Sequence, residues 1–375
     1  MAAVETIIVQ RVIPHYRVSL FRRLHQELGI QVVTAKTPPG DTFLSLADPM
    51  DLEFAVPAPF RFPNASNPFT ASVPTSWILA TLRPKRVIAE FGLRMSSSYQ
   101  LPWARRTGAI RRLAFWSHGW QMSRGFETRL DRWIQLARLP LFAAADAHAT
   151  YTSEGAAWVR RCLPRTPVVA LGNAIDLNAI CKASAAALPV RHGSPQFLAV
   201  GRLTRNKRFD VMMEAFAGIS TAYPGAGLTL IGDGPERDRL MTLAGARLGR
   251  SIRILDALYE EEDLAPHFLG ADFCLIPGAA GLTVNHALAY NLPVVCFART
   301  ALGPLHNPEI EYVVDGKTGI LAFTPSAHAL AEAAILAYRK GLHKAIADAL
   351  RGGTDLPTIE SMTANFKFLL QILSL

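Results

Sequence analysis

The chain has 375 residues, half of them apolar and 18% charged, which suits about two folded domains and excludes a disordered protein. Residues 1–175 hold 21 basic and 11 acidic side chains, a net of +10, whereas residues 176–375 hold 18 and 19, a net of −1. The first half therefore predicts an anionic partner, such as a membrane surface or a phosphorylated ligand.

No zinc ribbon or disulfide framework is expected, because none of the four cysteines is paired at metal-ligand spacing. We expect reduced, mostly buried thiols at Cys162, Cys181, Cys274 and Cys296. The chain opens without a charged and then apolar signal sequence, and no apolar run reaches the ~18–20 residues that span a bilayer. These features predict a cytoplasmic protein that can lie on the inner face of the cell membrane.

The first half is predicted to begin with a strand over 6–10, a helix over 18–28 and a strand over 30–34. Residues 36–75 carry many prolines that break every period, so we expect loop and irregular strand there. The remaining elements predicted for this half are strands over 86–90, 113–116 and 147–151, a helix over 124–144 and a helix start at Thr152.

Strands and helices alternate more clearly in the second half, which favours a parallel, doubly wound sheet. Strands are predicted over 197–200, 228–231, 252–255, 272–276, 293–297 and 319–322. Helices are predicted over 207–220, 235–248, 260–270, 283–291 and 325–341. The segment 171–176, where the charge balance changes, is the predicted domain junction. In such sheets, ligands bind beyond the carboxyl ends of the strands.

The first candidate site lies where the strand over 197–200 runs into Gly201-Arg202-Leu-Thr-Arg-Asn-Lys207. Glycine lets the backbone approach a ligand closely, and both Arg202 and Lys207 could reach one anion from this loop. A planar guanidinium and a compact ammonium together suit a diphosphate. A solvated basic loop before a helix is the alternative, and the spacing alone does not separate the two.

Two turns of small residues follow other strands of the second half. The turn from Gly232 to Glu236 is predicted to place Pro235 at the first helical position, which fits a plain turn and cap better than a ligand site. The segment 277–284 leads into a helix that begins near Leu282. The amides of residues 281–283 would then point outward and could bind an anion. Close packing of helix on sheet is the alternative reading, and both can hold together.

His118 ends a predicted strand of the first half and is followed by Gly119. A lone histidine is more often structural, but this position at the ligand edge of a sheet favours a functional role. Basic side chains alternate with Trp103, Phe126 and Trp133, which predicts a surface that lies among anionic lipid headgroups. These basic residues are Arg105, Arg106, Arg111, Arg112, Arg129, Arg132 and Arg138. A solvated helix face is the alternative, and no nucleic-acid partner is expected because no binding motif accompanies the charge.

The sequence lacks the motifs that are typical of several enzyme classes. There is no G-x-x-x-x-G-K-[ST], G-x-S-x-G or H-E-x-x-H, and no G-x-G-x-x-G in the first strand–helix–strand unit. No Asp-x-Asp pair is present to hold a divalent ion on a nucleotide, so no metal site is predicted. The acidic run 260–263 fits the first turn of a helix, where negative charge is favourable.

The second half resembles the retaining glycosyltransferases of family 4, which have the two-domain GT-B fold. The resemblance is carried by residues 200–210, 230–236, 271–273, 291–295 and 311–319, in family order and at family spacing over about 140 residues. The first half matches more loosely, through Trp116-Ser-His118-Gly119, Tyr151-Thr152 and the junction Gly172 to Asp176.

The resemblance implies a donor, a nucleotide diphosphate sugar, and a role for each matching residue. Arg202 and Lys207 would hold the diphosphate, with amides of the next helix start at Gly281, Leu282 and Thr283. His118 would lie near the reacting sugar. Leu258 would border the base, with Gly201 and Gly232 in the donor-binding turns.

The sequence departs from the family in one respect. The family commonly has two glutamates eight positions apart, which here are Gly278 and His286. The segment 277–286 instead resembles a branch of family 4 found in bacterial surface-polysaccharide loci, as do Pro14-His-Tyr-Arg17 and the segment 306–311. His286 could contact the ribose or a phosphate.

We therefore expect an α/β protein with two Rossmann-like domains facing a cleft. Residues 1–175 would bind the acceptor, residues 176–355 the donor, and residues 356–375 would form a helix that crosses back to the first domain. The predicted reaction is retaining transfer of a sugar to a hydroxyl of a glycan, carried on a polyprenyl diphosphate, without metal or cofactor. A sugar-nucleotide 2-epimerase and a non-catalytic binding protein of the same fold are the alternatives.

Overall fold

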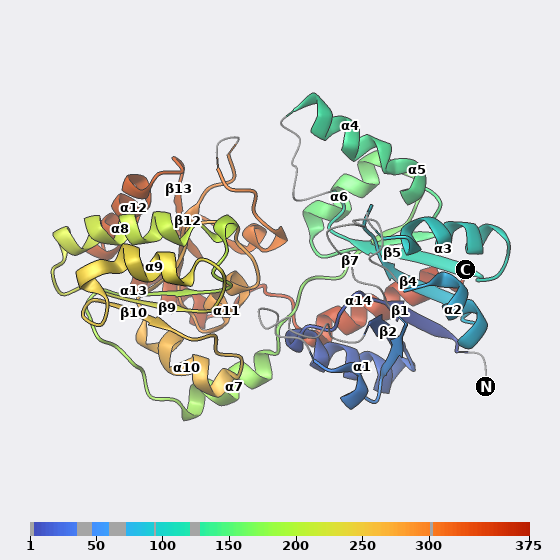
Figure 1. Ribbon diagram of the computed structural model, residues 1–375, viewed down its shortest axis with the longest axis horizontal. Helices are drawn as coiled ribbons and strands as arrows, with labels where there is room; N and C mark the ends of the chain where they lie inside the picture. Colours follow the sequence, from blue (N-terminus) through green and yellow to red (C-terminus); the bar gives the residue numbers. More distant parts are fainter. Residues whose placement is uncertain (1–3, 36–46, 60–72, 94, 121–127, 301–302) are drawn as a thin grey trace. The chain divides into compact units, whose positions relative to one another are not determined.

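The computed structural model describes residues 4–35, 47–59, 73–93, 95–120, 128–300 and 303–375. The chain forms two compact units, one of Met1–Ala174 with Pro357–Leu375 and one of Ile175–Leu356. The sequence predicted domain boundaries at 175/176 and 355/356, each one residue from these divisions. Each unit is an α/β layer structure around its own parallel sheet (Figure 1).

The first unit contains a seven-stranded parallel sheet with the order β3-β2-β1-β4-β5-β6-β7. Its strands are β1 (Thr6–Val9), β2 (Gln31–Ala35), β3 (Ala55–Ala58), β4 (Arg86–Glu90), β5 (Arg112–Ser117), β6 (Ala147–Thr150) and β7 (Val168–Ala170). Its helices are α1 (Val18–Leu28), α2 (Thr75–Thr81), α3 (Ser97–Arg106), α4 (Arg129–Ala137), α5 (Leu139–Phe142), α6 (Ser153–Cys162) and α14 (Ile359–Ile372). Short 3-10 turns, η1 (His15–Arg17) and η2 (Pro49–Asp51), lie in its loops.

The second unit contains a six-stranded parallel sheet with the order β10-β9-β8-β11-β12-β13. Its strands are β8 (Gln196–Val200), β9 (Gly227–Ile231), β10 (Ile252–Leu255), β11 (Phe273–Ile276), β12 (Val294–Phe297) and β13 (Gly319–Ala322). Its helices are α7 (Leu177–Ala186), α8 (Phe209–Ala222), α9 (Arg237–Ala244), α10 (Glu261–Gly270), α11 (Thr283–Ala289), α12 (Ala327–Arg339) and α13 (Leu342–Arg351), with 3-10 turns η3 (Arg205–Lys207), η4 (Gly245–Arg247) and η5 (Pro308–Tyr312).

The doubly wound sheet predicted for the second half is confirmed, and all six of its strands lie within one residue of their predicted starts and ends. Three helices of this unit, α8, α9 and α12, start two residues later than predicted. Helix α9 begins at Arg237 with Glu236 as its N-cap, so Pro235 lies in the turn. Two helices of this unit, α7 and α13, were not predicted.

In the first unit, the helix predicted over 124–144 is two helices. Helix α4 ends at Ala137, Arg138 is the N-cap of α5, and residues 124–127 lie outside the described residues. The region 36–75 contains a regular strand, β3, although Pro57 lies within it. Proline has no N–H to donate to a neighbouring strand. Because β3 is the edge strand and pairs on one side only, Pro57 breaks no hydrogen bond between two strands.

Helix α14 belongs to the first unit, although its residues follow the second unit along the chain. It packs against α1, and its Met362, Phe366 and Leu369 are fully buried in the same apolar core as Trp116. The Phe366 ring meets Trp116 edge-on at 5.3 Å. Burying each such side chain contributes ~1.5–3 kcal/mol, so that the first unit depends on residues at the far end of the chain.

Candidate functional site

The carboxyl edge of the second sheet carries the Gly201 loop, which interlocks with the turn after β9. Gly232 has a φ of +156°, and a Cβ on it would lie 2.0 Å from the carbonyl oxygen of Gly201. The Leu203 amide donates to the Asp233 carbonyl at 2.8 Å. Close backbone packing therefore explains the glycine at position 232. This packing holds in place the loop that carries Arg202 and Lys207.

Lys207 lies at the end of this loop, on η3, and reaches the turn between β11 and α11. Its ammonium donates to the carbonyl oxygen of Ala279 at 2.8 Å, and the Ala279 amide donates back to the Asn206 carbonyl at 3.0 Å. A Cβ on Gly278 would lie 2.4 Å from the Asn206 oxygen and 2.4 Å from the carbonyl carbon of Lys207. Glycine at position 278 is therefore what lets η3 lie against the second turn.

The start of α11 presents backbone donors next to this ammonium. Within the described chain, no acceptor pairs with the amides of Gly281, Leu282 or Thr283. A Cβ at Gly281 would lie 3.6 Å from the Lys207 ammonium, so the cation and the first free amide are neighbours. The sequence correctly placed the helix start at Leu282, which is the N-cap residue.

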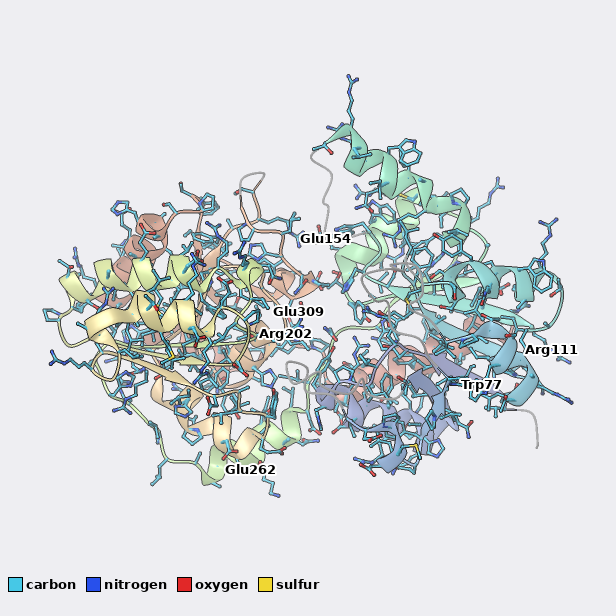
Figure 2. The ribbon with its side chains drawn as sticks, in the orientation of Figure 1. Trp77, Arg111, Glu154, Arg202, Glu262 and Glu309 are labelled. Atoms are coloured by element: carbon cyan, nitrogen blue, oxygen red, sulfur yellow. The ribbon has the colours of Figure 1, made fainter. Side chains whose placement is uncertain are left out.

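The electrostatics of this edge are positive. Burial, with a smaller contribution from the Arg202 cation, lowers the pKa of Lys207 to about 8, whereas Glu309 acts in the opposite direction. Arg202 is exposed, Lys207 is half-buried and Glu309 is buried. Figure 2 labels Arg202 and Glu309. Burial disfavours the charged form of Lys207, and a bound anion would favour that form again. The anion would take the place of the water that the ammonium lost on burial.

The structure brings a carboxylate to His286 that the sequence analysis missed. The His286 Nε2 lies 2.9 Å from Oε1 of Glu261, and the Tyr290 hydroxyl donates to Oε2 of the same carboxylate at 2.8 Å. Glu261 begins α10 and was read only as part of an acidic first turn. The four acidic residues in that turn look alike in sequence, and the chain carries no spacing signal that singles out Glu261.

Leu258 lies in the loop between β10 and α10. It packs against the apolar core to which buried residues of α11 also belong. Its place beside a nucleotide base stays a prediction. No group of three or more histidine, cysteine, aspartate or glutamate side chains in the described segments could hold a metal ion.

His118 lies in the first unit, directly after β5. Its ring packs on Tyr151 at 4.6 Å between centroids, and Nδ1 has no partner among the described residues. Burial, with smaller contributions from the Arg17 and Arg138 cations, lowers the pKa of His118 to about 4, so the ring is neutral at pH 7. Gly155 lies so close that a Cβ on it would be 2.7 Å from the His118 carbonyl oxygen.

Arg17 is a second buried group at this edge. Its guanidinium lies over the rings of Trp116 at 4.6 Å and Tyr151 at 5.0 Å, and donates to Oε1 of Gln10 at 3.2 Å. In the sequence, Arg17 is marked only by its place in Pro14-His-Tyr-Arg17, the segment that resembles the family branch. The predicted site residues thus fall into two sets, with His118 in the first unit and all the others in the second.

Residues 194–340 match the family model described as glycosyl transferases group 1. The match covers most of the second unit, including the Lys207 site. Solved structures match along nearly the whole chain, and those compared below have the two-domain GT-B architecture. The chain has the GT-B fold. No curated protein matches the sequence.

Three solved structures illustrate this likeness. HepE of Anabaena, in complex with UDP and glucose, has a TM-score of 0.68 at 13% identity, over 99% of this chain and 100% of that one. Sucrose-phosphate synthase of Thermosynechococcus elongatus gives 0.67 at 19% identity over 99% of both chains. The lipopolysaccharide outer core galactosyltransferase WaaB gives 0.63 at 14% identity over 98% of both.

Proposed function

We propose that the protein is a retaining glycosyltransferase that transfers a sugar from a nucleotide diphosphate sugar to a hydroxyl of a glycan. We further propose that the acceptor is linked to a polyprenyl diphosphate and that the reaction is a step of polysaccharide biosynthesis. The observation that carries the proposal is the positive site around Lys207, inside the region that matches group 1 glycosyltransferases. The UDP and glucose in the HepE complex support a sugar-nucleotide donor.

In this proposal the second unit stabilises the departing diphosphate. Lys207 and Arg202 supply two cations, and the amides of residues 281–283 supply donors that are already oriented before the donor binds. Because these groups do not have to reorganise as negative charge grows on the leaving oxygen, they lower the barrier more than solvent water would. We expect Gly201, Leu258 and His286 to border the same nucleotide.

In the first unit, neutral His118 can hydrogen-bond to the sugar or the acceptor without adding charge. In the described segments, no side chain stands out as a nucleophile on the basis of its contacts. We therefore propose that the departing phosphate takes the proton of the acceptor hydroxyl on the face that the acceptor attacks, which gives retention. The chain then contributes mainly by positioning the reactants.

A hydrolysis screen with common sugar nucleotides, beginning with UDP-glucose, tests the proposal. Slow release of a nucleoside diphosphate from one donor, accelerated by a glycan acceptor, supports a transferase. Interconversion of the sugar while it stays on the nucleotide indicates an epimerase instead. Neither binding nor turnover with any donor indicates a protein that keeps the fold without the chemistry.

We expect transfer to survive chelation, because Lys207 and Arg202 supply the positive charge that a divalent ion otherwise brings to a diphosphate. The measurement is the transfer rate in excess EDTA, compared with the rate after Mg²⁺ or Mn²⁺ is added back. Loss of activity in EDTA with recovery on adding either ion would contradict metal independence.

We expect the affinity for UDP to fall as the pH rises from 7 to 9. The pKa of Lys207 is lowered to about 8, so that the free protein loses this positive charge above that pH. The dissociation constant should then increase, approaching about tenfold per pH unit. Titration calorimetry at several pH values measures this, and the Lys207→Met variant should bind weakly with no such dependence. An equal slope in that variant would mean that another group titrates.

We also propose that the first unit lies on an anionic membrane surface. The exposed apolar side chains of α4 support this proposal. The usual burial pattern is reversed on this helix, with apolar side chains exposed and a polar one buried. Leu130, Trp133 and Leu136 are 58–66% exposed, while Gln135 is 1% exposed. Arg129, on the same helix, is also exposed. Apolar side chains beside cations suit the boundary between lipid headgroups and acyl chains. No helix in the described chain is long and apolar enough to cross a membrane.

Two of the arginines predicted for this surface are placed differently. Arg138 is 4% exposed and lies over the Phe91 and Phe142 rings at 4.9 and 4.7 Å, and Arg105 is held by Asp146 through two hydrogen bonds of 2.8 Å. Both are fixed by local packing or pairing. Phe126 lies outside the described residues.

We expect the triple change of Leu130, Trp133 and Leu136 to serine to reduce binding to anionic vesicles by about tenfold or more, since each apolar side chain withdrawn from lipid costs ~1.5–3 kcal/mol when fully buried. Co-sedimentation with vesicles of varied anionic content measures this. The matched control changes three exposed apolar residues of the second unit, Leu188, Phe323 and Leu336, to serine. Equal binding by wild type and the α4 variant would contradict the membrane role of this face.

A further inference from the structure

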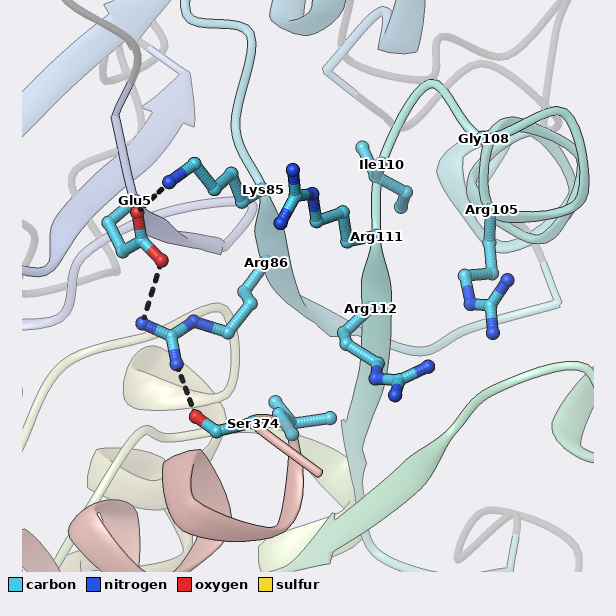
Figure 3. A pocket seen from close by; sticks show the side chains of 10 residues that line it. Glu5, Lys85, Arg86, Arg105, Gly108, Ile110, Arg111, Arg112 and Ser374 are labelled. Atoms are coloured by element: carbon cyan, nitrogen blue, oxygen red, sulfur yellow. Dashed lines mark hydrogen bonds and ion pairs between the residues drawn. The ribbon is translucent and has the colours of Figure 1, made fainter.

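The first unit has a second basic feature, at the opposite edge of its sheet from His118. A pocket of 480 Å³ is lined by five cationic side chains and one carboxylate, together with Gly108, Ile110, Leu373 and Ser374. The cations are Lys85, Arg86, Arg105, Arg111 and Arg112, and the carboxylate is Glu5 (Figure 3).

The pocket lies at the amino-terminal ends of three adjacent strands. Arg86 begins β4 and Arg112 begins β5, and the two residues are direct partners in the sheet. His118 follows the other end of β5, and six residues at ~3.3 Å each place roughly 20 Å between the two edges. Ligands of parallel sheets normally bind at the carboxyl edge, so this pocket is separate from the donor and acceptor sites proposed above.

The backbone brings together the two segments that carry Lys85, Arg111 and Arg112. The carbonyl oxygen of Lys85 accepts the amides of both Arg111 and Arg112, at 2.8 and 3.2 Å. This anchors the segment before β5 beside the segment before β4. Like charges that line one pocket repel each other, and bound anions are the direct way to relieve that repulsion.

The carboxylates present do not balance this charge. Glu5 pairs with Lys85 at 2.8 Å and Arg86 at 3.3 Å, and Asp146, just outside the pocket, pairs closely with Arg105 but only at 3.7 Å with Arg112. Five cations against these two carboxylates leave an excess of three positive charges. An anion with two or more negative charges would match that excess.

The individual contacts show which cations are free to bind. Arg86 is the most engaged of the five, because each of its three nitrogens donates to a described partner, namely Thr6, Ser374 or Glu5. Arg105 is engaged with Asp146. The Arg111 guanidinium, by contrast, makes no hydrogen bond or ion pair with a described residue and reaches Glu5 only through its longer-range charge, and Lys85 keeps donors beyond the one that it gives to Glu5.

We propose that this pocket binds a phosphate-bearing anion through Lys85, Arg111 and Arg112, with Arg86 and Arg105 holding the walls in place. Guanidinium groups donate in a fork that matches phosphate oxygens, and an ammonium adds a point charge. The anion is either a soluble phosphate compound or the phosphate of a lipid headgroup, and both present the same oxygens to the same three cations.

Titration calorimetry with pyrophosphate at low ionic strength tests this. Pyrophosphate should bind wild type twice, once at the Lys207 site and once in the pocket. Lys207→Met should retain the pocket event, and the double variant Arg111→Gln/Arg112→Gln should retain the Lys207 event while weakening the other by about tenfold or more for each lost contact. A failure of the proposed function would remove the Lys207 event and leave the pocket event in place.

The matched control is Arg339→Gln/Lys340→Gln, which removes two exposed charges from the second unit and should retain both events. If the first double variant unfolds, Lys85→Gln/Arg111→Gln replaces it as the pocket variant. This second variant keeps the Arg105–Asp146 pair and the Arg86–Ser374 hydrogen bond intact. Pyrophosphate binding that is unchanged in a folded pocket variant, or equally reduced in the control, would overturn the proposal.

Vesicles of phosphatidylcholine with and without phosphatidic acid separate the two sources. If the pocket variant loses both pyrophosphate and phosphatidic-acid binding, and pyrophosphate displaces wild type from the vesicles, the ligand is a lipid headgroup. If the variant loses pyrophosphate but binds these vesicles as wild type does, the ligand is a soluble phosphate compound.

Discussion

Replacing Lys207 by methionine should lower turnover by roughly 10²–10³-fold, the loss typical when a charged group that stabilises a developing oxyanion is removed. Its ammonium lies against the Ala279 carbonyl and beside Gly281, where the free amides begin. Methionine is also unbranched and is only one atom shorter than lysine, and it removes the charge. Arg202→Ala should have a smaller effect, about tenfold to hundredfold, because an exposed cation is weakened by solvent.

Arg205→Gln is the matched control for this prediction. Arg205 belongs to the same loop, but its side chain is 89% exposed and pairs with Glu236. It should retain near-wild-type turnover, and all three variants should unfold at the wild-type temperature within a few degrees. Wild-type turnover in folded Lys207→Met would remove Lys207 from the donor site.

Gly278→Ala should destabilise the second unit by about 1–3 kcal/mol and weaken nucleotide binding by about tenfold or more. The new Cβ would lie 2.4 Å from backbone atoms of Asn206 and Lys207, and backbone cannot rotate away as a flexible side chain can. The two turns must therefore separate, which withdraws the ammonium from Ala279. Thermal unfolding and UDP titration on the same samples measure both effects.

Two further variants sharpen this test. Gly281→Ala should be much milder, since its Cβ would meet only side-chain atoms, at 3.2 Å from Asn307 and 3.6 Å from Lys207. Gly278→Glu, which places an acid where the resembling family commonly has one, should be at least as damaging as alanine. A gain of activity in Gly278→Glu would show that the turns have room for a side chain and that this account of position 278 is wrong.

The parts of the fold that the sequence predicted are those in which local pattern and tertiary role agree. Short apolar runs such as 228–231 form buried strands inside the sheet, and their pattern needs no knowledge of neighbours. The strand around Pro57 could not be predicted, because proline is tolerated there only at a sheet edge, and the strand order is not local information. The helix over Leu177–Ala186 is hidden by small residues with weak periodicity.

The candidate site divides in the same way. Arg202, Lys207 and the helix start at Leu282 are readable because their spacing along the chain already places them on one edge of a sheet. The clash that requires glycine at position 278 depends on how closely η3 approaches a turn 70 residues later. The contact between Glu261 and His286 depends in the same way on two helices meeting in space.

The packing of α14 into the first unit has a consequence for biosynthesis. When residue 174 leaves the ribosome, the core around Trp116 still lacks Met362, Phe366 and Leu369, which are synthesised only after the whole second unit. The intervening residues take roughly 10–40 s to translate at ~5–20 residues per second, and the first unit cannot complete its core during that interval. The usual order in which domains are completed on the ribosome is therefore reversed here. The strongly basic first unit stays incomplete, and exposed to chaperones and proteases, until α14 emerges.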